Sequence, residues 1–301
     1  MKEGTPLVSI ITLNYNQATV TCEFLESTRK LTYKNYEILV CDMDSEECPA
    51  DKIQSLNLPN TKVLLSGTNL GFAAGNNWGM RQAKGDYFFI VNNDTEVTPH
   101  LLEDLLAPFL SDPSIGVTCP KIRFFSHPNI IQYAGFTKMK PVSGRTHSIG
   151  FGEEDKGQHN VSGYTHGAHG CAMMVKRSVA EKVGMFPEKF FLYYEEWDWS
   201  ERILAAGYKI YYEAKALIFH KESLSVGKNN PLKTYYLTRN RILFMRRNRS
   251  MTERLAFYSY FALATFPKSI VTYLVKGQFG FLKAFLRGIA WNFSNSKYSP
   301  V

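Results

Sequence analysis

The stretch FFIVNNDTEV, residues 88–97, runs four apolar residues directly into two amides and a carboxylate. An uninterrupted apolar run of this kind is typical of a strand that is buried on both faces. Asn92, Asn93 and Asp94 follow at the point where that strand should end. One such residue is ordinarily explained by turn formation or helix capping, so the question is whether other strands end in the same way.

Further apolar runs lie upstream at 8–12, 36–41 and 62–66, and they alternate with helical patterns. The helical patterns include one at about 17–30 and one at about 71–83. Strands that are apolar throughout and alternate with helices predict an α/β domain with a mostly parallel central sheet and helices on both faces.

Ligands of such sheets bind outside the carboxyl ends of the strands. Asn14 follows the first strand, Asp42 and Asp44 follow the second, and Asn92 to Asp94 follow the fourth, so polar groups are expected to converge on one edge. Neither GxGxxG nor GxxxxGK[ST] follows any of these strands, which argues against the loops that bind phosphate in dehydrogenases and P-loop ATPases. A carboxylate with a bound metal ion remains as the means of holding phosphate.

Five segments in order carry a family resemblance. They are VSIITLNYN (8–16), ILVCDMDS (38–45), NLGFAAGNNWG (69–79), FIVNNDTEV (89–97) and FFLYYEEWDWSERI (190–203). Together they resemble the motif set of family 2 glycosyltransferases, and among these the rhamnosyltransferase-like members that build cell-surface polysaccharides. The resemblance implies a GT-A fold, a nucleotide-sugar donor, a divalent metal ion, and inversion at the anomeric carbon.

For the metal, the resemblance matches NND to a DXD-type motif in which Asn92 replaces the first acid and Asp94 is retained. Asp94 is the expected ligand of Mg²⁺ or Mn²⁺, cations that prefer oxygen ligands. His220, which ends the apolar run 216–219, is implied as a further metal ligand or diphosphate contact. The structural alternatives are that Asp94 caps a helix beginning near Thr98 and that His220 lines the sheet edge without a metal.

The resemblance also implies a set of donor contacts. Asp42 matches the acid that accepts a hydrogen bond from the ring N3–H of uracil or thymine, so it favours UDP or dTDP without choosing between them. Asp44 is expected on the ribose side, although turn formation explains it nearly as well. The remaining expected donor-binding residues are Thr12, Asn14, Gly75, Asn76, Arg81, Asn92 and Asn93. Close helix packing is the alternative for the glycines.

The segment FFLYYEEWDWSERI predicts a strand-like aromatic run that enters a helix near Glu195. The resemblance assigns the catalytic base to Glu196, while Glu195 and Asp198 stay open as alternatives. Neighbouring aromatic side chains that partly bury these carboxyls would raise their pKa and make them better bases near neutral pH. A solvated acidic face at the start of a helix is the alternative explanation.

Charge divides the chain in two. Residues 228–301 hold thirteen Lys or Arg and one acid, Glu253, so their net charge is +12. Because the whole chain carries +8, residues 1–227 carry 8 − 12 = −4. We expect a catalytic domain at 1–227 and a basic tail of amphipathic helices that lies on an anionic membrane. The side chains assigned to that surface are Lys268, Lys276, Lys283 and Arg287 toward the headgroups and Trp291 inserted. Packing on the catalytic domain or a contact between copies in a homo-oligomer is the alternative.

A membrane site suits a glycan or polyprenyl-linked acceptor. The five cysteines lack CxxC spacing and the first apolar run is too short for a signal peptide, which predicts a cytoplasmic protein, peripheral on the inner face of the cell membrane. No RNA-binding or DNA-binding motif is present, so no nucleic-acid partner is expected. The rival functions are a sugar nucleotidyltransferase, whose glycine-rich basic loop is missing after the first strand, and a non-catalytic carbohydrate-binding or nucleic-acid-binding protein.

Overall fold

The apolar runs form neighbouring strands in one sheet. In the computed structural model, which describes residues 4–221 and 230–299, the strands β1 (Val8–Asn14), β2 (Tyr36–Asp42), β3 (Thr61–Leu65) and β4 (Tyr87–Val91) are parallel and lie in the order β3-β2-β1-β4. β1 and β2 are buried along nearly their whole length, as their uninterrupted apolar sequences predict. The polar residues that follow these strands therefore share one edge of the sheet.

The second half of the sheet is mixed. β9 (Ala172–Lys176) runs antiparallel between β4 and β6 (Ile115–Phe124), and β6 then pairs in parallel with β10 (Lys209–His220). Short strands β7 (Ile131–Tyr133) and β8 (Gly163–Thr165) pair with β6 and β10. β5 (Thr95–Val97) pairs antiparallel with the end of β10, and Thr95 lies opposite His220. That pairing brings residues 94 and 220 together.

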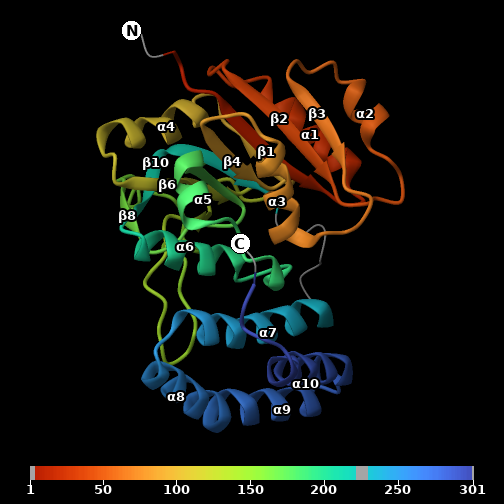
Figure 1. Cartoon of the computed structure of the whole chain (residues 1–301), viewed down its shortest axis with the longest axis vertical. Helices are drawn as coiled ribbons and strands as arrows, with labels where there is room; N and C mark the ends of the chain where they lie inside the picture. Colours follow the sequence, from red (N-terminus) through yellow and green to blue (C-terminus); the bar gives the residue numbers. More distant parts are fainter. Residues whose placement is uncertain (1–3, 222–229, 300–301) are drawn as a thin grey trace.

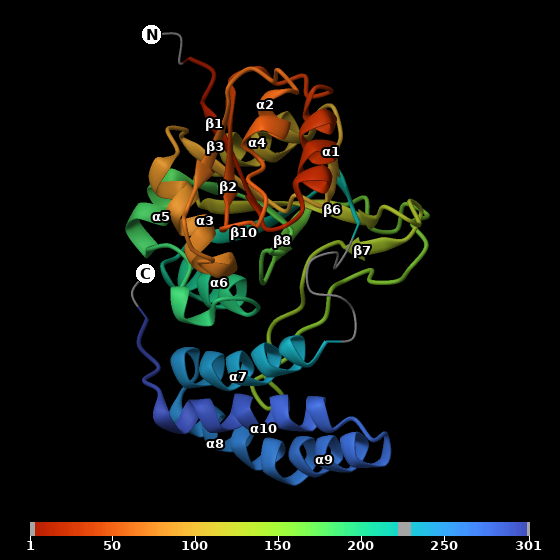
Figure 2. The same ribbon diagram turned by 90° about the vertical axis from the view of Figure 1, so that its right-hand side faces the viewer.

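Helices cover both faces of the sheet (Figure 2), which confirms the predicted α/β class. The helices α1 (Ala18–Thr28) and α4 (Leu101–Ser111) lie on one face, and α3 (Gly71–Gln82), α5 (Arg177–Val183) and α6 (Glu195–Ala205) lie on the other, while a short α2 (Ala50–Gln54) connects β2 to β3. Gly79 explains the close approach of α3, because a Cβ there would lie 2.6 Å from Ile11 Cγ2 and 2.9 Å from Cys41 Sγ.

The C-terminal helices form a separate layer beyond the sheet (Figure 1). They are α7 (Pro231–Asn248), α8 (Met251–Tyr260), the π-helical turn η2 (Phe261–Thr265), α9 (Phe266–Val275) and α10 (Phe279–Ser294). A hairpin at 136–148 reaches from the sheet toward this layer, held by bridges Phe136–Ser148 and Lys140–Arg145. Among the described residues, no helix combines the length and apolar character needed to cross a bilayer. The expected boundary at 227–228 lies outside the described residues.

A second hydrophobic core joins this layer to the sheet domain. Phe190, just before α6, and Trp197 of α6 pack in one cluster with Phe244 of α7 and Phe285 of α10. Within the basic tail, α7 therefore packs on the protein, and its Arg239 and Arg241 are buried there. Trp291 likewise packs inward. The guanidinium of Arg239 lies 4.7 Å from the centre of the Trp291 ring.

The aromatic run before Glu195 is not a strand. A 3₁₀ turn, η1 (Glu188–Phe190), is followed by Phe191, Tyr193 and Tyr194 at φ angles of 64°, 69° and 74°. Aromatic residues rarely adopt this left-handed region, so tertiary contacts must hold the segment there. Its conformation could not be expected from an apolar run alone.

Candidate active site

A cavity of about 470 Å³ lies at the carboxyl ends of β1 and β4, bounded by the end of β10 and the segment before α6. It is the place where the strand order predicts a ligand site. The predicted site residues that line it are Asn76, Asn92, Asn93, Asp94, Glu195, Glu196 and His220. Residues more than 100 positions apart in the sequence thus face one space.

Asp94 and His220 form the closest contact between ionisable groups in this cavity. Oδ1 of Asp94 lies 3.1 Å from Nε2 of His220, and both residues are 6% exposed. The approach lacks hydrogen-bond geometry, and neither atom has another hydrogen-bond partner among the described residues. Two buried acceptor-type atoms that face one another in this way suit a shared cation.

Gln132 of β7 fixes the orientation of the imidazole. Its Oε1 lies 2.8 Å from Nδ1 of His220, so Nδ1 donates to Gln132 and Nε2 of the same ring is turned toward Asp94. The part of the chain that the structure describes contains no cluster of three or more His, Cys, Asp or Glu suited to a metal ion. Asp94 and His220 are therefore two candidate ligands, without a third His, Cys, Asp or Glu that completes a cluster with them in the described chain.

Glu195 and Glu196 open α6 at the opposite wall of the cavity. Each has its Oε2 atom buried without a hydrogen-bond partner among the described residues. Burial raises the pKa of Glu196 to about 7, and burial together with the neighbouring Glu196 raises the pKa of Glu195 well above its usual range. A buried carboxyl whose pKa is raised toward neutrality has the proton affinity that suits a general base.

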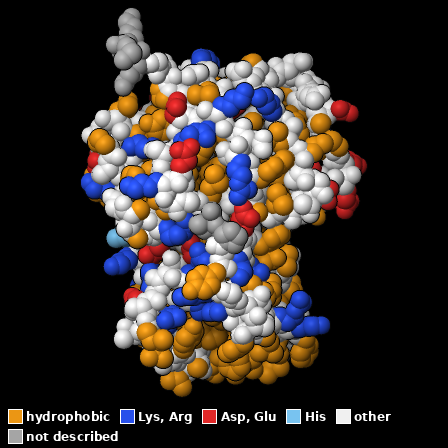
Figure 3. All heavy atoms as spheres, in the orientation of Figure 1, with side chains coloured by type: hydrophobic (Ala, Val, Ile, Leu, Met, Phe, Trp, Pro, Cys, Tyr) orange, Lys and Arg blue, Asp and Glu red, His pale blue; other side chains and the backbone are white. Residues whose placement is uncertain are grey.

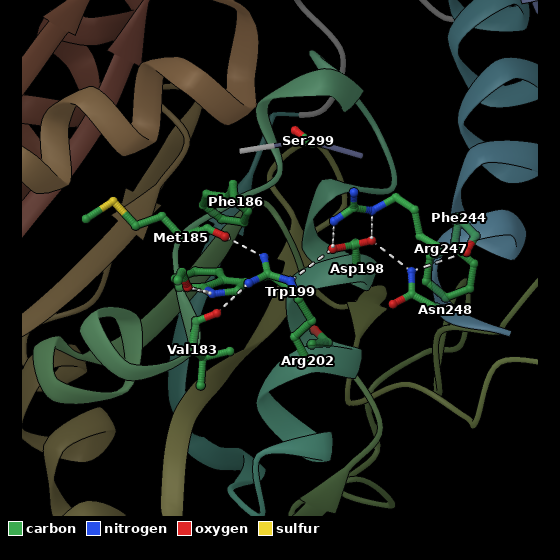
Figure 4. Close-up of polar contacts among 12 residues, drawn as sticks. Val183, Met185, Phe186, Asp198, Trp199, Arg202, Phe244, Arg247, Asn248 and Ser299 are labelled. Carbon is green, nitrogen blue, oxygen red and sulfur yellow. Dashed lines mark hydrogen bonds and ion pairs between the residues drawn. The ribbon is translucent and has the colours of Figure 1, made fainter. Parts of the chain in front are cut away.

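Asp198, the third predicted acid, lies elsewhere. It is fully buried, and its oxygens accept from Arg202 Nε at 3.0 Å, Arg247 Nε at 2.6 Å and Asn248 Nδ2 at 2.8 Å (Figure 4). The carboxylate does not line the cavity, and its charge is balanced by two guanidinium groups. Its geometry fits a structural link between α6 and α7 and does not fit a catalytic base.

Asn14 and Asp42 are tied together beneath the cavity edge. Asn14 Nδ2 donates to Asp42 Oδ1 at 2.7 Å, and Ser45 donates to both Asp42 oxygens. Asn14 Oδ1 accepts from Thr21, whose hydroxyl accepts in turn from Asn93 Nδ2 at 2.9 Å. This chain of hydrogen bonds connects the ends of β1, β2 and β4 and fixes the position of Asn93.

Six of the nine predicted donor contacts lie outside the cavity lining, namely Asn14 and Asp42, described above, and four others. Thr12 is fully buried within β1, and Asp44 is exposed in a turn at φ 65°. Gly75 packs on the sheet, since a Cβ there would lie 2.7 Å from Met43 Sδ. Arg81 forms an ion pair with Glu188 at 3.0 Å. Packing and turn formation account for these residues.

The loop that carries the glutamates is held by α7. Nδ2 of Asn240 donates to the carbonyl oxygens of Phe190, Leu192 and Tyr193 at 3.0, 2.7 and 2.7 Å. Arg239 donates to the carbonyls of Lys189 and Phe190. These contacts satisfy the backbone of a segment with left-handed residues and thereby position Glu195 and Glu196.

Sequence reasoning did not assign roles to Gln132, Arg239 or Asn240. Gln132 stands in a short strand with no motif around it, and only the register of β7 brings it to His220. Arg239 and Asn240 lie within the basic segment, where their charge and polarity suggested solvent or headgroups. The sequence feature that could have indicated their role is the polar pair Arg239 and Asn240 among the apolar positions of this helix.

Comparison with known proteins agrees with this architecture. Residues 9–184 match the model of glycosyl transferase family 2. The chain is 28% identical over 260 residues to the uncharacterized protein y4gI of Sinorhizobium fredii, covering 81% of this chain and 28% of that protein. It is 23% identical over 252 residues to the N-acetylglucosaminyl-diphospho-decaprenol L-rhamnosyltransferase of Mycobacterium tuberculosis, covering 75% and 79%.

A solved structure shows the same fold. The mannosyltransferase PcManGT from Pyrobaculum calidifontis, in complex with GDP-Man and Mn²⁺, superposes with a TM-score of 0.61 at 16% identity, over 98% of this chain and 77% of that one. The sheet, its covering helices and this likeness define a glycosyltransferase fold of the GT-A type. The chain belongs to glycosyl transferase family 2, as the family model matches more than half of its length.

Proposed function

We propose that this chain is an inverting glycosyltransferase. It moves a sugar from a nucleoside diphosphate donor, dTDP-rhamnose or a UDP-sugar, to a glycan or lipid-linked acceptor in cell-surface polysaccharide synthesis. The observation that carries this proposal is the placement of two unpaired carboxyls, Glu195 and Glu196, in the same cavity as the Asp94–His220 pair. The name of the mycobacterial relative supports rhamnose and a lipid-linked diphosphate acceptor.

Glu196 acts as the base in this proposal. Its carboxylate takes the proton from an acceptor hydroxyl as that oxygen bonds to C1 of the sugar, and the bond from C1 to the diphosphate oxygen breaks on the opposite side. A single displacement of this kind inverts C1 and needs no covalent nucleophile. Glu195 lies beside it in the same cavity, and burial together with Glu196 raises the pKa of Glu195, which disfavours a second negative charge near the donor.

The residues present fit a divalent cation, Mg²⁺ or Mn²⁺, at Asp94 and His220. Bound there, the ion would stabilise the negative charge that develops on the departing diphosphate. Asn92, in place of a second acid, leaves the cavity less negative toward the diphosphate itself. The protein side of the site is consequently better suited to an ion that arrives with its nucleotide than to an ion held alone.

Donor recognition is proposed for the polar residues at the strand ends. Asn76, Asn92 and Asn93 line the cavity and offer amide groups to the sugar and phosphates. Asp42 stays the proposed contact of the base, because its Oδ2 accepts one hydrogen bond, from the Ser45 backbone N–H, and keeps a lone pair for a ring N3–H. The carboxyl end of β2 supports this role, because it adjoins the cavity edge formed by Met43.

We propose that α8, α9 and α10 bind the membrane surface. α9 has no buried residue, and large apolar side chains are exposed along this layer, including Leu263 at 81%, Val275 at 82% and Phe293 at 88%. Figure 3 shows the apolar side chains gathered at the end of the molecule formed by these helices, with Lys and Arg side chains above them. That combination is typical of a protein lying in the interface of an anionic bilayer.

The proposed function is tested with purified full-length protein and a panel of nucleotide sugars with Mn²⁺ or Mg²⁺. A donor should raise the melting temperature and be hydrolysed slowly to a nucleoside diphosphate, and Glu196→Gln should keep the first effect while losing the second. Stabilisation by no nucleotide sugar would overturn the proposal. Release of pyrophosphate from a nucleoside triphosphate and a sugar phosphate would instead indicate a nucleotidyltransferase.

A further inference from the structure

A second cavity, of about 300 Å³, lies in the C-terminal layer between α7, the η2–α9 segment, α10 and the hairpin 136–148. Two arginines line it, Arg145 from the hairpin and Arg241 from α7. Hydroxyl groups of Thr234, Thr238, Ser269 and Tyr273 line it as well. None of its lining residues, within the described chain, is an acid.

Arg241 is buried without a full set of partners. It is 5% exposed, its Nε donates to the carbonyl of Ser143 at 2.6 Å, and its Nη2 is buried with no hydrogen-bond partner among the described residues. The rings of Phe257 and Phe261 lie 5.4 and 5.6 Å from the guanidinium and offer weak cation–π contact. A buried charge with an unused donor costs stability unless an anion completes it.

Arg145 adds a second positive charge to the same space. Burial, with repulsion from Arg145 as a smaller contribution, lowers the pKa of Arg241 to about 10, so Arg241 is still charged at neutral pH. Two guanidinium groups with several hydroxyl donors and no carboxylate form an arrangement that suits a phosphate or diphosphate.

The position of this cavity relates it to the first one. Tyr194 lines the second cavity, and the next two residues, Glu195 and Glu196, line the first. On the other side, Ser269 and Tyr273 belong to α9, whose Val271 and Leu274 are 59% and 50% exposed. A phosphate group held here has the proposed base on one side and the apolar outer face of the helices on the other.

We propose that Arg145 and Arg241 bind the phosphate or diphosphate of a lipid-linked acceptor, with the lipid chain leaving along α9 and the acceptor sugar directed past Tyr194 toward Glu196. This inference rests on the proposed function, because it takes the acceptor of that reaction to be lipid-linked. It assigns the cavity a ligand class, a prenyl-type (di)phosphate, and gives the C-terminal layer a part in choosing the acceptor.

The test uses the full-length protein in detergent with EDTA, and geranylgeranyl diphosphate as the probe, measured by thermal shift and by fluorescence titration. Wild type should bind the probe more tightly than geranylgeraniol, which lacks the phosphates. Arg145→Gln should lower the affinity for the probe about tenfold, which is the effect expected from the loss of one charge-assisted hydrogen bond. Arg29→Gln, which removes an exposed charge just after α1 and outside both cavities, is the matched control and should leave the affinity within about twofold.

Arg241→Gln tests the buried partner, and Arg145→Gln keeps the inference testable if that variant fails to fold, because Arg145 is exposed. Equal binding of inorganic pyrophosphate would indicate a site for free phosphate, and a matching loss of binding to phosphatidylglycerol vesicles by Arg145→Gln would indicate a general membrane contact; either result overturns the inference. Unchanged probe affinity in both variants overturns it too. Nucleotide binding at the first cavity, measured in parallel samples with Mn²⁺ in place of EDTA, reports separately on the proposed function.

Discussion

Asp94 Oδ1 and His220 Nε2 face one another at 3.1 Å across the join between β5 and β10, although 126 positions separate them in the chain. The antiparallel pairing of Thr95 with His220 sets this distance, and Gln132 sets the tautomer of the imidazole. The pair is thus built by strand register, and its properties can be tested apart from turnover.

His220→Ala is expected to weaken the joint binding of Mn²⁺ and a uridine or thymidine diphosphate by about ten- to a hundredfold, because one of two protein ligands is lost. Asp94→Ala should have a larger effect. Isothermal titration of the nucleotide, with Mn²⁺ and with EDTA, measures both. Nucleotide affinity that is the same with and without metal in the wild-type protein would contradict the assignment.

Gln132→Leu should weaken metal-dependent nucleotide binding to a smaller extent than His220→Ala, since the imidazole stays but loses its orientation. Gln132→Glu should restore the hydrogen bond and recover part of the affinity. The same titration separates the two variants. If leucine and glutamate behave alike, Gln132 has no positioning role.

Glu196 should give the reaction a distinctive pH dependence. With a pKa of about 7, its base form is lost as pH falls, so kcat/KM should drop about tenfold per pH unit below 7 and level off above it. Glu196→Gln should abolish turnover at every pH while donor affinity changes only a few fold. A flat rate profile between pH 5 and 8 would exclude Glu196 as the base.

The same group should affect stability in the opposite sense. Its folded pKa lies above its unfolded value, so its contribution to stability is present below about pH 4.5 and is lost as pH rises through about 7. Glu196→Gln, which is neutral throughout, should therefore gain about 1 to 3 kcal/mol over wild type between pH 5 and pH 8. Urea unfolding at the two pH values measures the difference.

Asn240→Ala should lower kcat more than it raises KM for the donor, because three carbonyls before Glu195 lose their donor. We expect a loss of about 1 to 3 kcal/mol in unfolding free energy, as buried acceptors are left unsatisfied. Asn295→Ala, at the end of α10, is the control for an amide that binds only its own helix end. Equal kcat and KM values for the two variants would contradict a role of Asn240 in positioning the base.

Binding to vesicles tests the outer helices. Leu263→Glu and Val275→Glu place charges at side chains that are 81% and 82% exposed, so they should leave the fold intact and reduce co-sedimentation with phosphatidylglycerol vesicles severalfold. Leu110→Glu on α4, 79% exposed and outside the C-terminal layer, is the matched control. Retention of both outer-helix variants on vesicles at wild-type levels would exclude this surface.

The central strands and the cavity edge were predicted from local sequence. Uninterrupted apolar runs predicted β1, β2 and β4, and the polar residues after them converge as expected, with Asn92, Asn93 and Asp94 all in the cavity. The antiparallel insertion of β9 could not be predicted, because AMMVK has the same apolar character as a parallel strand.

Residues whose contacts depend on long-range partners could not be assigned from the sequence alone. Asp198 shares its helix and acidic character with Glu196, and only the arrival of Arg247 from α7 distinguishes a buried ion pair from a free carboxyl. Arg239 lies in the basic tail, where a basic, apolar helix has the same pattern whether it meets lipid or another part of the protein. Burial decides between the two, and burial is a property of the whole fold.

The hydrogen bonds from Asn240 and Arg239 to the carbonyls of residues 189–193 limit how the C-terminal helices can be exchanged. A chimera that exchanges the C-terminal helices with those of a relative would also replace the side chains that hydrogen-bond to the backbone of residues 189–193. Such a chimera should keep its activity only when the relative supplies both the segment that corresponds to 186–198 and the helix that corresponds to α7.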